Sequence, residues 1–341
     1  MDDPETLSIR CDGPAEHDRP RFVGATFLPA RGMNVFAVRA FVPGCGEMDL
    51  LHSPALGDTA SAPSFSFGGA FLVPFANRIR GRVSADASTI ETTVLGQRVT
   101  LPANWHGPEP GAEHCAMHGL MLDAPLEITE RERDRIACVF RAGDFGGHWL
   151  SRAVVHVSAE LRAAQLMLTV TTENAGVSPL PVGIGWHPYF ALPSGRREQA
   201  LVHLPARQRA LVTNHDDVFP TGEIEPVAGT VYDFTAERGA ALGAEYFDDC
   251  FVDLLKTPDG HTCVDISDPA AGYRMRLTAL SQHVRALQLY APPHQPFVVV
   301  EPQFNLADPF SSVWPSTVDT GMVVLRPGEH VTWAVRWELL H

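Results

Sequence analysis

An imidazole and a carboxylate each stand in a segment that is otherwise apolar and aromatic. Residues 183–193 read GIGWHPYFALP and place His187 between a tryptophan and a proline, whereas Glu301 follows the apolar run 297–300. A histidine in such a run often has only a structural role, but a carboxylate there is costly unless it is paired or used. Imidazole and carboxylate together can perform general acid–base catalysis, and a free histidine has a pKa of about 6.5. His187 and Glu301 are therefore the candidate catalytic pair.

Three further segments combine polar side chains with aromatic or glycine neighbours. They are FGGAFLVPFANRIRGR at 67–82, HCAMHGLMLDAPLEI at 114–128 and EYFDDCFVDL at 245–254. Each segment is also compatible with an exposed turn. A sugar site needs aromatic faces and a few polar groups that reach hydroxyls, and these segments supply both. The candidate binding residues are Asn77, Arg78, His118, Asp248 and Asp249.

The spacing of histidines and cysteines does not favour a metal site. His114 and His118 are four residues apart, but a glycine follows the second and no HExxH pattern is present. The cysteines at positions 11, 45, 115, 138, 250 and 263 form no CxxC pair and no disulfide or zinc-ligand spacing. We therefore expect neither a metal ion nor a disulfide framework.

The charge balance argues against one class of partner. The chain has 341 residues, with 26 basic and 40 acidic side chains and a formal net charge of −14. No basic patch is separated from the acidic residues, so nucleic acid is not expected to bind. The acidic start, MDDPETLSIRCDG, lacks the apolar core of a secretory signal, and no apolar run nears the about 18 residues of a membrane span. We expect a cytoplasmic protein that binds small molecules and no membrane.

The elements that position the candidate residues are expected to be β strands. Apolar alternation or β-branched residues mark the runs ACVFRAG, AVVHVSAEL, AQLMLTVTTEN and LVHLPAR, each bounded by Gly, Pro, Asn or a charge. Near the end of the chain, a Pro-Gly pair at 327–328 predicts a turn before another alternating strand. One face of that strand carries Val331, Trp333, Val335 and Trp337.

Long helical patterns with capping residues are scarce, which limits the fold classes that fit. Many strands with turn signals between them predict an all-β fold, a large antiparallel β-sandwich. No linker or internal repeat divides the chain. We expect a single domain over residues 1–341, with 1–20 as a peripheral N-terminal segment.

The order of the short motifs resembles that of the aldose 1-epimerase (galactose mutarotase) family. The motifs are NRI at 77–79, HG at 118–119, HPYF at 187–190, DDCF at 248–251, EP at 301–302 and PGE-x3-W at 327–333. Together they are spread over nearly the whole chain. The family fold is a β-supersandwich, in agreement with the strand pattern.

The resemblance implies an isomerase that interconverts the α and β anomers of a hexose such as galactose or glucose. His187 would be the general acid that protonates the ring oxygen, and Glu301 would be the general base that takes the proton of the C1 hydroxyl. The ring opens, rotates about C1–C2 and closes as the other anomer. Because no electrons or groups are transferred, no cofactor is implied.

The same resemblance implies roles for the binding residues. Arg78 and His118 would bind sugar oxygens near the ring oxygen, with Asn77 beside them. An aspartate would hold hydroxyls further round the ring. The family motif usually reads Asp-His, whereas this chain has Asp248-Asp249, so either carboxylate could face the sugar.

Two other functions stay open at this point. An epimerase of a phosphorylated or otherwise modified sugar would need basic residues for the substituent, for which Arg80, Arg82 and Arg152 are candidates. A non-catalytic carbohydrate-binding protein on the same fold would not need both His187 and Glu301. The expected partner is a monosaccharide in the first instance, and the protein is a monomer or a homodimer.

Overall fold

The computed structural model describes residues 6–11 and 19–340, and nearly all of their regular structure is antiparallel β strand. Beside the strands, these ranges contain short 3-10 turns, η1 (Leu56–Ser61), η2 (Ser64–Ser66), η3 (Arg197–Gln199) and η4 (Pro269–Ala271). Within the same ranges, no helix has the length and apolar character needed to cross a membrane. The predicted all-β class is confirmed.

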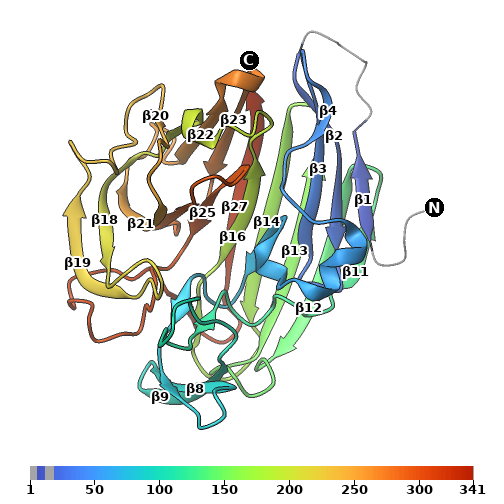
Figure 1. Cartoon of the computed structure of the whole chain (residues 1–341). Coiled ribbons are helices and arrows are strands. Elements are labelled where there is room, and N and C mark those ends of the chain that lie inside the picture. Colours follow the sequence, from blue (N-terminus) through green and yellow to red (C-terminus); the bar gives the residue numbers. More distant parts are fainter. Residues whose placement is uncertain (1–5, 12–18, 341) are drawn as a thin grey trace.

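Two large sheets form the body of the molecule. The nine-stranded sheet has the order β11 (Glu127–Arg131), β12 (Arg135–Gly143), β13 (Ala153–Leu161), β14 (Gln165–Asn174), β27 (His330–Leu340), β23 (Tyr273–Ala279), β22 (Thr262–Asp268), β17 (Leu201–His203) and β20 (Ala240–Ala241). The seven-stranded sheet has the order β19 (Pro220–Pro226), β18 (Ala206–Val212), β21 (Phe247–Leu254), β24 (Ala286–Ala291), β25 (Phe297–Gln303), β16 (Gly185–Ala191) and β5 (Gly69–Leu72). In Figure 1, β18, β19 and β21 lie on one side of the molecule and β11 and β12 on the other.

Smaller sheets complete the described fold. One contains β1 (Leu7–Arg10), β2 (Arg21–Leu28), β3 (Asn34–Val42) and β4 (Gly46–Asp49). The others are β6 (Arg78–Ile79) with β10 (Ala116–Met117), β15 (Leu180–Val182) with β26 (Val323–Leu325), and β7 (Arg82–Val83) with β8 (Thr89–Val94) and β9 (Gln97–Pro102).

Part of the N-terminal segment is integrated into the first of these small sheets. β1 pairs with β2, and Leu7 and Ile9 are buried in the hydrophobic core. Of the segment 1–20 that we expected to be peripheral, residues 1–5 and 12–18 lie outside the described residues.

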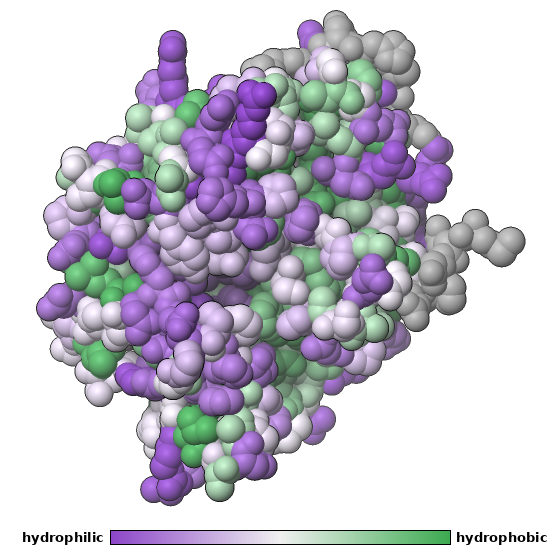
Figure 2. All heavy atoms as spheres, in the orientation of Figure 1, coloured by the Kyte–Doolittle hydropathy of each residue, from purple (hydrophilic) through white to green (hydrophobic). Residues whose placement is uncertain are grey.

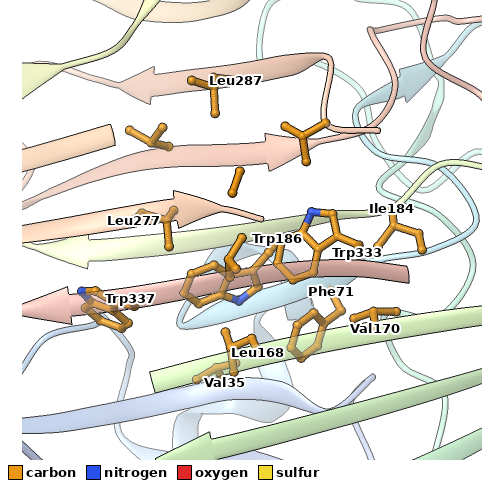
Figure 3. Close-up of a cluster of buried hydrophobic side chains, with 14 of the residues drawn as sticks. Val35, Phe71, Leu168, Val170, Ile184, Trp186, Leu277, Leu287, Trp333 and Trp337 are labelled. Carbon is orange, nitrogen blue, oxygen red and sulfur yellow. The ribbon is translucent and has the colours of Figure 1, made fainter. Parts of the chain in front are cut away.

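The core lies between the two large sheets, and tryptophans fill its centre. Trp186 of β16 packs against Trp337 of β27 with ring centroids 6.2 Å apart, and Phe71 of β5 meets Trp333 of β27 edge to face at 6.3 Å. Figure 3 shows these rings together with aliphatic side chains from both sheets. The face of the last strand that alternates Val331, Trp333, Val335 and Trp337 is buried throughout. Burial of these large apolar surfaces is the main force that holds the sheets together.

The alternation of side chains in β16 divides the motif WHPYF, residues 186–190, between two faces. Trp186 and Phe190 point into the core, where both pack against Trp337. His187 and Tyr189 therefore lie on the opposite face of the seven-stranded sheet, because successive side chains in a strand point to opposite sides. The apolar half of the motif anchors the strand, and the other half is presented at the outer face.

Candidate active site

Neighbouring strands of the seven-stranded sheet bring the candidate catalytic residues together. The register of β16 and β25 is fixed by the pairs Tyr189–Val299 and Gly185–Gln303. That register places His187 opposite Glu301. On the other side of β25, Glu301 pairs with Gln288 of β24, and one strand further Asp248 of β21 pairs with Tyr290. Residues far apart in sequence thus form adjacent rows on one face.

These side chains border a cavity of about 710 Å³, within the range of roughly 300–1,000 Å³ that is usual for small-ligand pockets. The predicted site residues that line it are Asn77, Arg78, His118, His187, Asp248 and Glu301. Figure 2 shows a hollow near the middle of one face of the molecule, surrounded mainly by hydrophilic side chains. Six residues that the sequence analysis selected from five segments are therefore gathered in one place.

His187 and Glu301 form a close, buried pair. His187 Nε2 lies 3.5 Å from Glu301 Oε1, and the two side chains are 7% and 2% exposed. Burial lowers the pKa of His187 below its ordinary value, and the charge of Arg78 lowers it further. Burial also raises the pKa of Glu301 well above its ordinary value, with a contribution from Asp248. The surroundings therefore favour the uncharged forms, with the proton of the pair on Glu301.

This result changes one expectation. The sequence analysis took the ordinary histidine pKa of about 6.5 as suited to a general acid. The pKa of His187 is lower than that because little water reaches its ring to stabilise the imidazolium. Burial of Glu301 raises its pKa and so increases its basicity.

Two site residues adopt a backbone conformation that is uncommon outside glycine. Asn77 and His118 have φ angles of 60° and 63°, in the left-handed region where strained residues of functional sites often lie. The His118 N–H donates to the Asn77 carbonyl at 2.8 Å, extending the pairing of β6 and β10. At Gly119, which has a φ of 84°, a Cβ would lie 2.3 Å from the Val73 carbonyl oxygen. Glycine at 119 therefore allows the chain to hold His118 at the cavity.

A closed ring of hydrogen bonds joins four buried side chains of the site. Arg78 Nη2 donates to Asp248 Oδ2 at 3.2 Å, and Gln288 Nε2 donates to Asp248 Oδ1 at 2.6 Å. Asn77 Nδ2 donates to Gln288 Oε1 at 3.0 Å, and Arg78 Nη1 donates to Asn77 Oδ1 at 3.3 Å. Desolvation raises the pKa of Asp248, while Arg78 opposes that rise. The ring holds each member in one orientation before any ligand binds.

The two adjacent aspartates point to opposite sides of β21. Asp248 lines the cavity, whereas Asp249 does not and is fully buried. Asp249 Oδ1 accepts a hydrogen bond from Arg209 Nη1 at 2.8 Å. The expectation that Asp249 contacts a sugar directly does not fit this arrangement, because side chains alternate along a strand and only Asp248 is on the cavity side.

Several polar atoms at the cavity are buried without a protein partner in the described chain. They are Arg78 Nε, His118 Nδ1, His187 Nδ1 and Glu301 Oε2. A buried donor or acceptor without a partner costs about 1–3 kcal/mol, so proteins retain such atoms where a ligand satisfies them. The pKa of His118 is lowered mainly by burial, and then by His187 and Arg78, so its ring is neutral near pH 7. These atoms offer both donors and an acceptor to hydroxyl groups.

The sequence analysis expected aromatic faces but named none of the aromatic residues of the cavity wall, and it did not name Gln288. The cavity is also lined by Phe65, Trp105, Tyr189, Tyr246, Gln288 and Tyr290. In the run ALQLYA at 286–291, Gln288 and Tyr290 alternate with buried leucines, and this polar residue within an apolar strand was an available signal. Tyrosine and tryptophan faces are suited to pack against apolar C–H groups of a ligand.

Trp333 of the PGE-x3-W motif contacts the residue that follows Glu301, from the core side of the sheet. Trp333 is fully buried, and its Nε1–H donates to the Pro302 carbonyl at 3.0 Å. This bond joins β27 of one large sheet to the residue that directly follows Glu301 in the other. The PGE-x3-W and EP motifs are therefore two parts of one tertiary contact.

The described residues offer little to a phosphate or a metal ion. Arg80 pairs with Glu113, and Arg82 pairs with Glu91, so neither guanidinium is directed to the cavity. Arg152 is an exposed residue next to β13 and does not line the cavity either. No cluster of three or more potential metal-binding side chains occurs in the described ranges.

One family model matches most of the chain. A family model described as aldose 1-epimerase matches residues 47–338. Two Escherichia coli K12 proteins, both described as uncharacterised, match at 28% identity over 131 residues and 26% over 148 residues. These matches span 38% and 43% of this chain, and only 39% and 44% of the two relatives.

Solved structures resemble the whole fold. A GalM/aldose epimerase homologue from C. elegans superposes with a TM-score of 0.77 at 19% identity, covering 98% of both chains. A galactose mutarotase-like protein from Clostridium acetobutylicum gives a TM-score of 0.75 at 18% identity, covering 94% of both chains. At these identities the likeness establishes the fold, and the predicted β-supersandwich is confirmed.

Proposed function

Because the chain belongs to the aldose 1-epimerase family, we propose that it is a mutarotase that interconverts the α and β anomers of a hexose such as galactose or glucose. The observation that carries this proposal is the buried His187–Glu301 pair, with 3.5 Å between Nε2 and Oε1, on the floor of a cavity lined by aromatic rings. An imidazole and a carboxylate so close can reach two neighbouring oxygens of one sugar ring.

The proposed reaction moves one proton in each direction and breaks one bond. Glu301 takes the proton of the C1 hydroxyl while the C1–O5 bond breaks and C1 becomes an aldehyde carbon. His187, as imidazolium, gives its proton to O5. After rotation about C1–C2, the two groups exchange roles, and closure on the other face of the carbonyl yields the other anomer. The pair begins and ends with one proton, so no cofactor is needed.

The surroundings of the pair support this cycle. Burial favours the state in which Glu301 holds the proton and His187 is neutral. That is the protonation state reached once the ring has opened, so the site stabilises the open-chain intermediate. The hydroxyl oxygens of a bound sugar and the nearby unpaired donors compensate for the charges of the closed-ring state. Acid and base contributions of roughly 100- to 10,000-fold each are sufficient for a reaction that already proceeds in water.

The binding roles follow from the unpaired atoms and the hydrogen-bonded ring. Arg78 Nε and His118 Nδ1 are available to sugar oxygens beside the catalytic pair. Asp248 is held by Arg78 and Gln288, and its free lone pairs can accept hydroxyl protons. Asn77 serves this network by holding Gln288 and Arg78.

The test follows the optical rotation of freshly dissolved α-D-galactose and α-D-glucose. Wild-type protein should accelerate the change in rotation, and His187→Gln and Glu301→Gln should each lower kcat by about 100-fold or more. His156→Gln is the matched control, because His156 is an exposed histidine on β13, in the other large sheet. No acceleration by folded wild-type protein with either sugar would count against a hexose mutarotase.

A further inference from the structure

A turn between β18 and β19 brings another histidine to the cavity. His215 lines the cavity, and its side chain is 37% exposed. The turn is braced from within, since Asn214 Oδ1 accepts from the N–H groups of Asp216 at 2.8 Å and Asp217 at 2.7 Å. It is also braced from outside, because Asp217 Oδ1 accepts from the Glu113 N–H at 2.8 Å. These hydrogen bonds hold the turn, and with it the backbone of His215, in one conformation.

A buried ion pair lies behind the ring of His215. His215 Nε2 is 3.4 Å from Asp249 Oδ2, and Asp249 is itself held by Arg209 Nη1 at 2.8 Å. The guanidinium of Arg209 packs 3.7 Å above the ring of Tyr232. A carboxylate at one ring nitrogen of a histidine fixes the orientation and the tautomer of the ring. Asp249, which does not reach the cavity, acts on it through His215.

The other ring nitrogen is available. The two nitrogens of an imidazole point away from each other, so Nδ1 of His215 points away from the buried carboxylate of Asp249. Within the described chain, Nδ1 has no hydrogen-bond partner, and the ring lies 5.3 Å from that of Tyr246 in the same cavity wall. An oriented histidine with one free nitrogen at a cavity is a suitable partner for a polar group of a ligand.

We propose that His215 is a substrate-binding residue that contacts a sugar hydroxyl remote from C1, and that Asp249 is its positioning residue. The inference rests on the proposed function, because it takes the ligand to be a sugar. The strand order places β21, β24 and β25 between β18 and β16, so His215 approaches the ligand from the side opposite His187. The hydroxyl that it contacts is therefore on the part of the ring away from the reacting carbon.

The charges around His215 favour a neutral hydroxyl over an anionic substituent. Asp248, Asp216 and Glu109 line the same cavity, and the charge of Asp248 acts on His215. Arg209 lies behind it, neutralised by Asp249. The hydrogen bond to Asp249 raises the pKa of His215. Both protonation states can bond a hydroxyl, because neutral Nδ1 accepts its proton and protonated Nδ1 donates to its oxygen.

The experiment compares wild type with His215→Ala and Asp249→Asn. The matched control is Asp253→Asn, which breaks the exposed pair of Arg207 and Asp253 between the same two strands, β18 and β21, at 3.4 Å. We expect His215→Ala to raise KM about threefold to tenfold and to change kcat less than KM, as loss of one hydrogen bond outside the reacting atoms should. Asp249→Asn should also raise KM. Asp253→Asn should match wild type in both KM and kcat.

Monodeoxy hexoses identify the contact. One deoxy sugar should bind wild type more weakly than its parent hexose does. That deoxy sugar should bind His215→Ala as tightly as it binds wild type, because it already lacks the hydroxyl that His215 contacts. Equilibrium dissociation constants from calorimetry give this comparison independently of turnover. A fall in kcat at unchanged KM in His215→Ala, or equal further losses for every deoxy sugar, would overturn the inference. Sugar binding without any rate acceleration would instead overturn the proposed function.

Discussion

His187 and Glu301 face each other across β16 and β25, with Nε2 of one 3.5 Å from Oε1 of the other. The sequence between the two residues includes four strands of the nine-stranded sheet, namely β17, β20, β22 and β23. Their proximity depends on the register of a single strand pair. A one-residue slip of that register would turn every side chain of one strand to the opposite face.

The pH dependence of kcat should show a broad plateau. The active pair carries one proton, so activity falls on the acid side when the pair gains a second proton and on the basic side when it loses its last one. Burial lowers the pKa of His187 and raises that of Glu301, which moves the two limbs apart. The pKa that describes the acid side of the profile should lie below 6.5, the ordinary pKa of histidine. A polarimetric rate profile that falls with an acid-side pKa of 6.5 or more would contradict this.

Removal of the indole N–H of Trp333 should reduce both stability and activity. Trp333→Phe leaves the buried carbonyl of Pro302 without its donor, at a cost of about 1–3 kcal/mol. Because Pro302 follows Glu301, kcat should also fall. Trp149→Phe is the matched control, since Trp149 Nε1–H donates to the Pro181 carbonyl at 2.8 Å away from Glu301. Urea unfolding and polarimetry on both variants separate the effects, and equal loss of kcat in both would refute the link to Glu301.

Gly119→Ala should destabilise the protein more than Gly96→Ala. Both glycines have a φ near 80°, at 84° and 79°, so each substitution incurs a left-handed backbone cost of roughly 1–2 kcal/mol. At Gly96 a Cβ meets nothing within 4 Å, whereas at Gly119 it lies 2.3 Å from the Val73 carbonyl oxygen. Only Gly119→Ala should also raise KM, because it displaces His118. Denaturant unfolding and KM measurements check this, and equal stabilities would show that the close contact is relieved at no cost.

Asp308→Asn should stabilise the protein at high pH and not at low pH. Burial raises the pKa of Asp308 from 3.8 to about 6. The folded-state pKa is above the unfolded value. The protonated carboxyl therefore contributes fully to the free energy of unfolding below pH 3.8, and this contribution is lost as the pH rises through about 6.

Asparagine stays neutral at every pH and can still accept from the Arg80 N–H, which Asp308 Oδ1 does at 3.1 Å. The difference in unfolding free energy between Asp308→Asn and wild type should therefore grow between those two pH values and level off above them. Urea titrations at pH 4 and pH 8 measure it. A difference that is the same at both pH values would show that the charge of Asp308 is not the cause.

Much of the fold could be predicted because strand patterns depend on local sequence. AVVHVSAEL became β13 at Ala153–Leu161, and the turn at 327–328 does precede the last strand. The alternation that placed Trp333 and Trp337 on one face follows from the period of two that every strand obeys. Such features need only neighbouring residues to decide them.

The candidate site was predicted in part, for a related reason. His187, Glu301 and Arg78 stood out as polar groups in apolar or glycine-rich surroundings, where such groups are rare without a use. Gln288 and His215 gave weak signals or none, because a glutamine in a strand and a histidine in a turn are common. Their importance comes from partners on other strands, Asp248 for the first and Asp249 for the second.

The sequence by itself determined the strands, their faces and the residue types available for acid–base chemistry, since all three depend on local pattern. Alternation alone also required Asp248 and Asp249 to point in opposite directions. Only the tertiary structure decided which of them faces the cavity, because that depends on which side of β21 packs against the other sheet. The tertiary structure likewise set the pKa shifts of His187 and Glu301, which arise from burial by side chains that sequence order does not bring together.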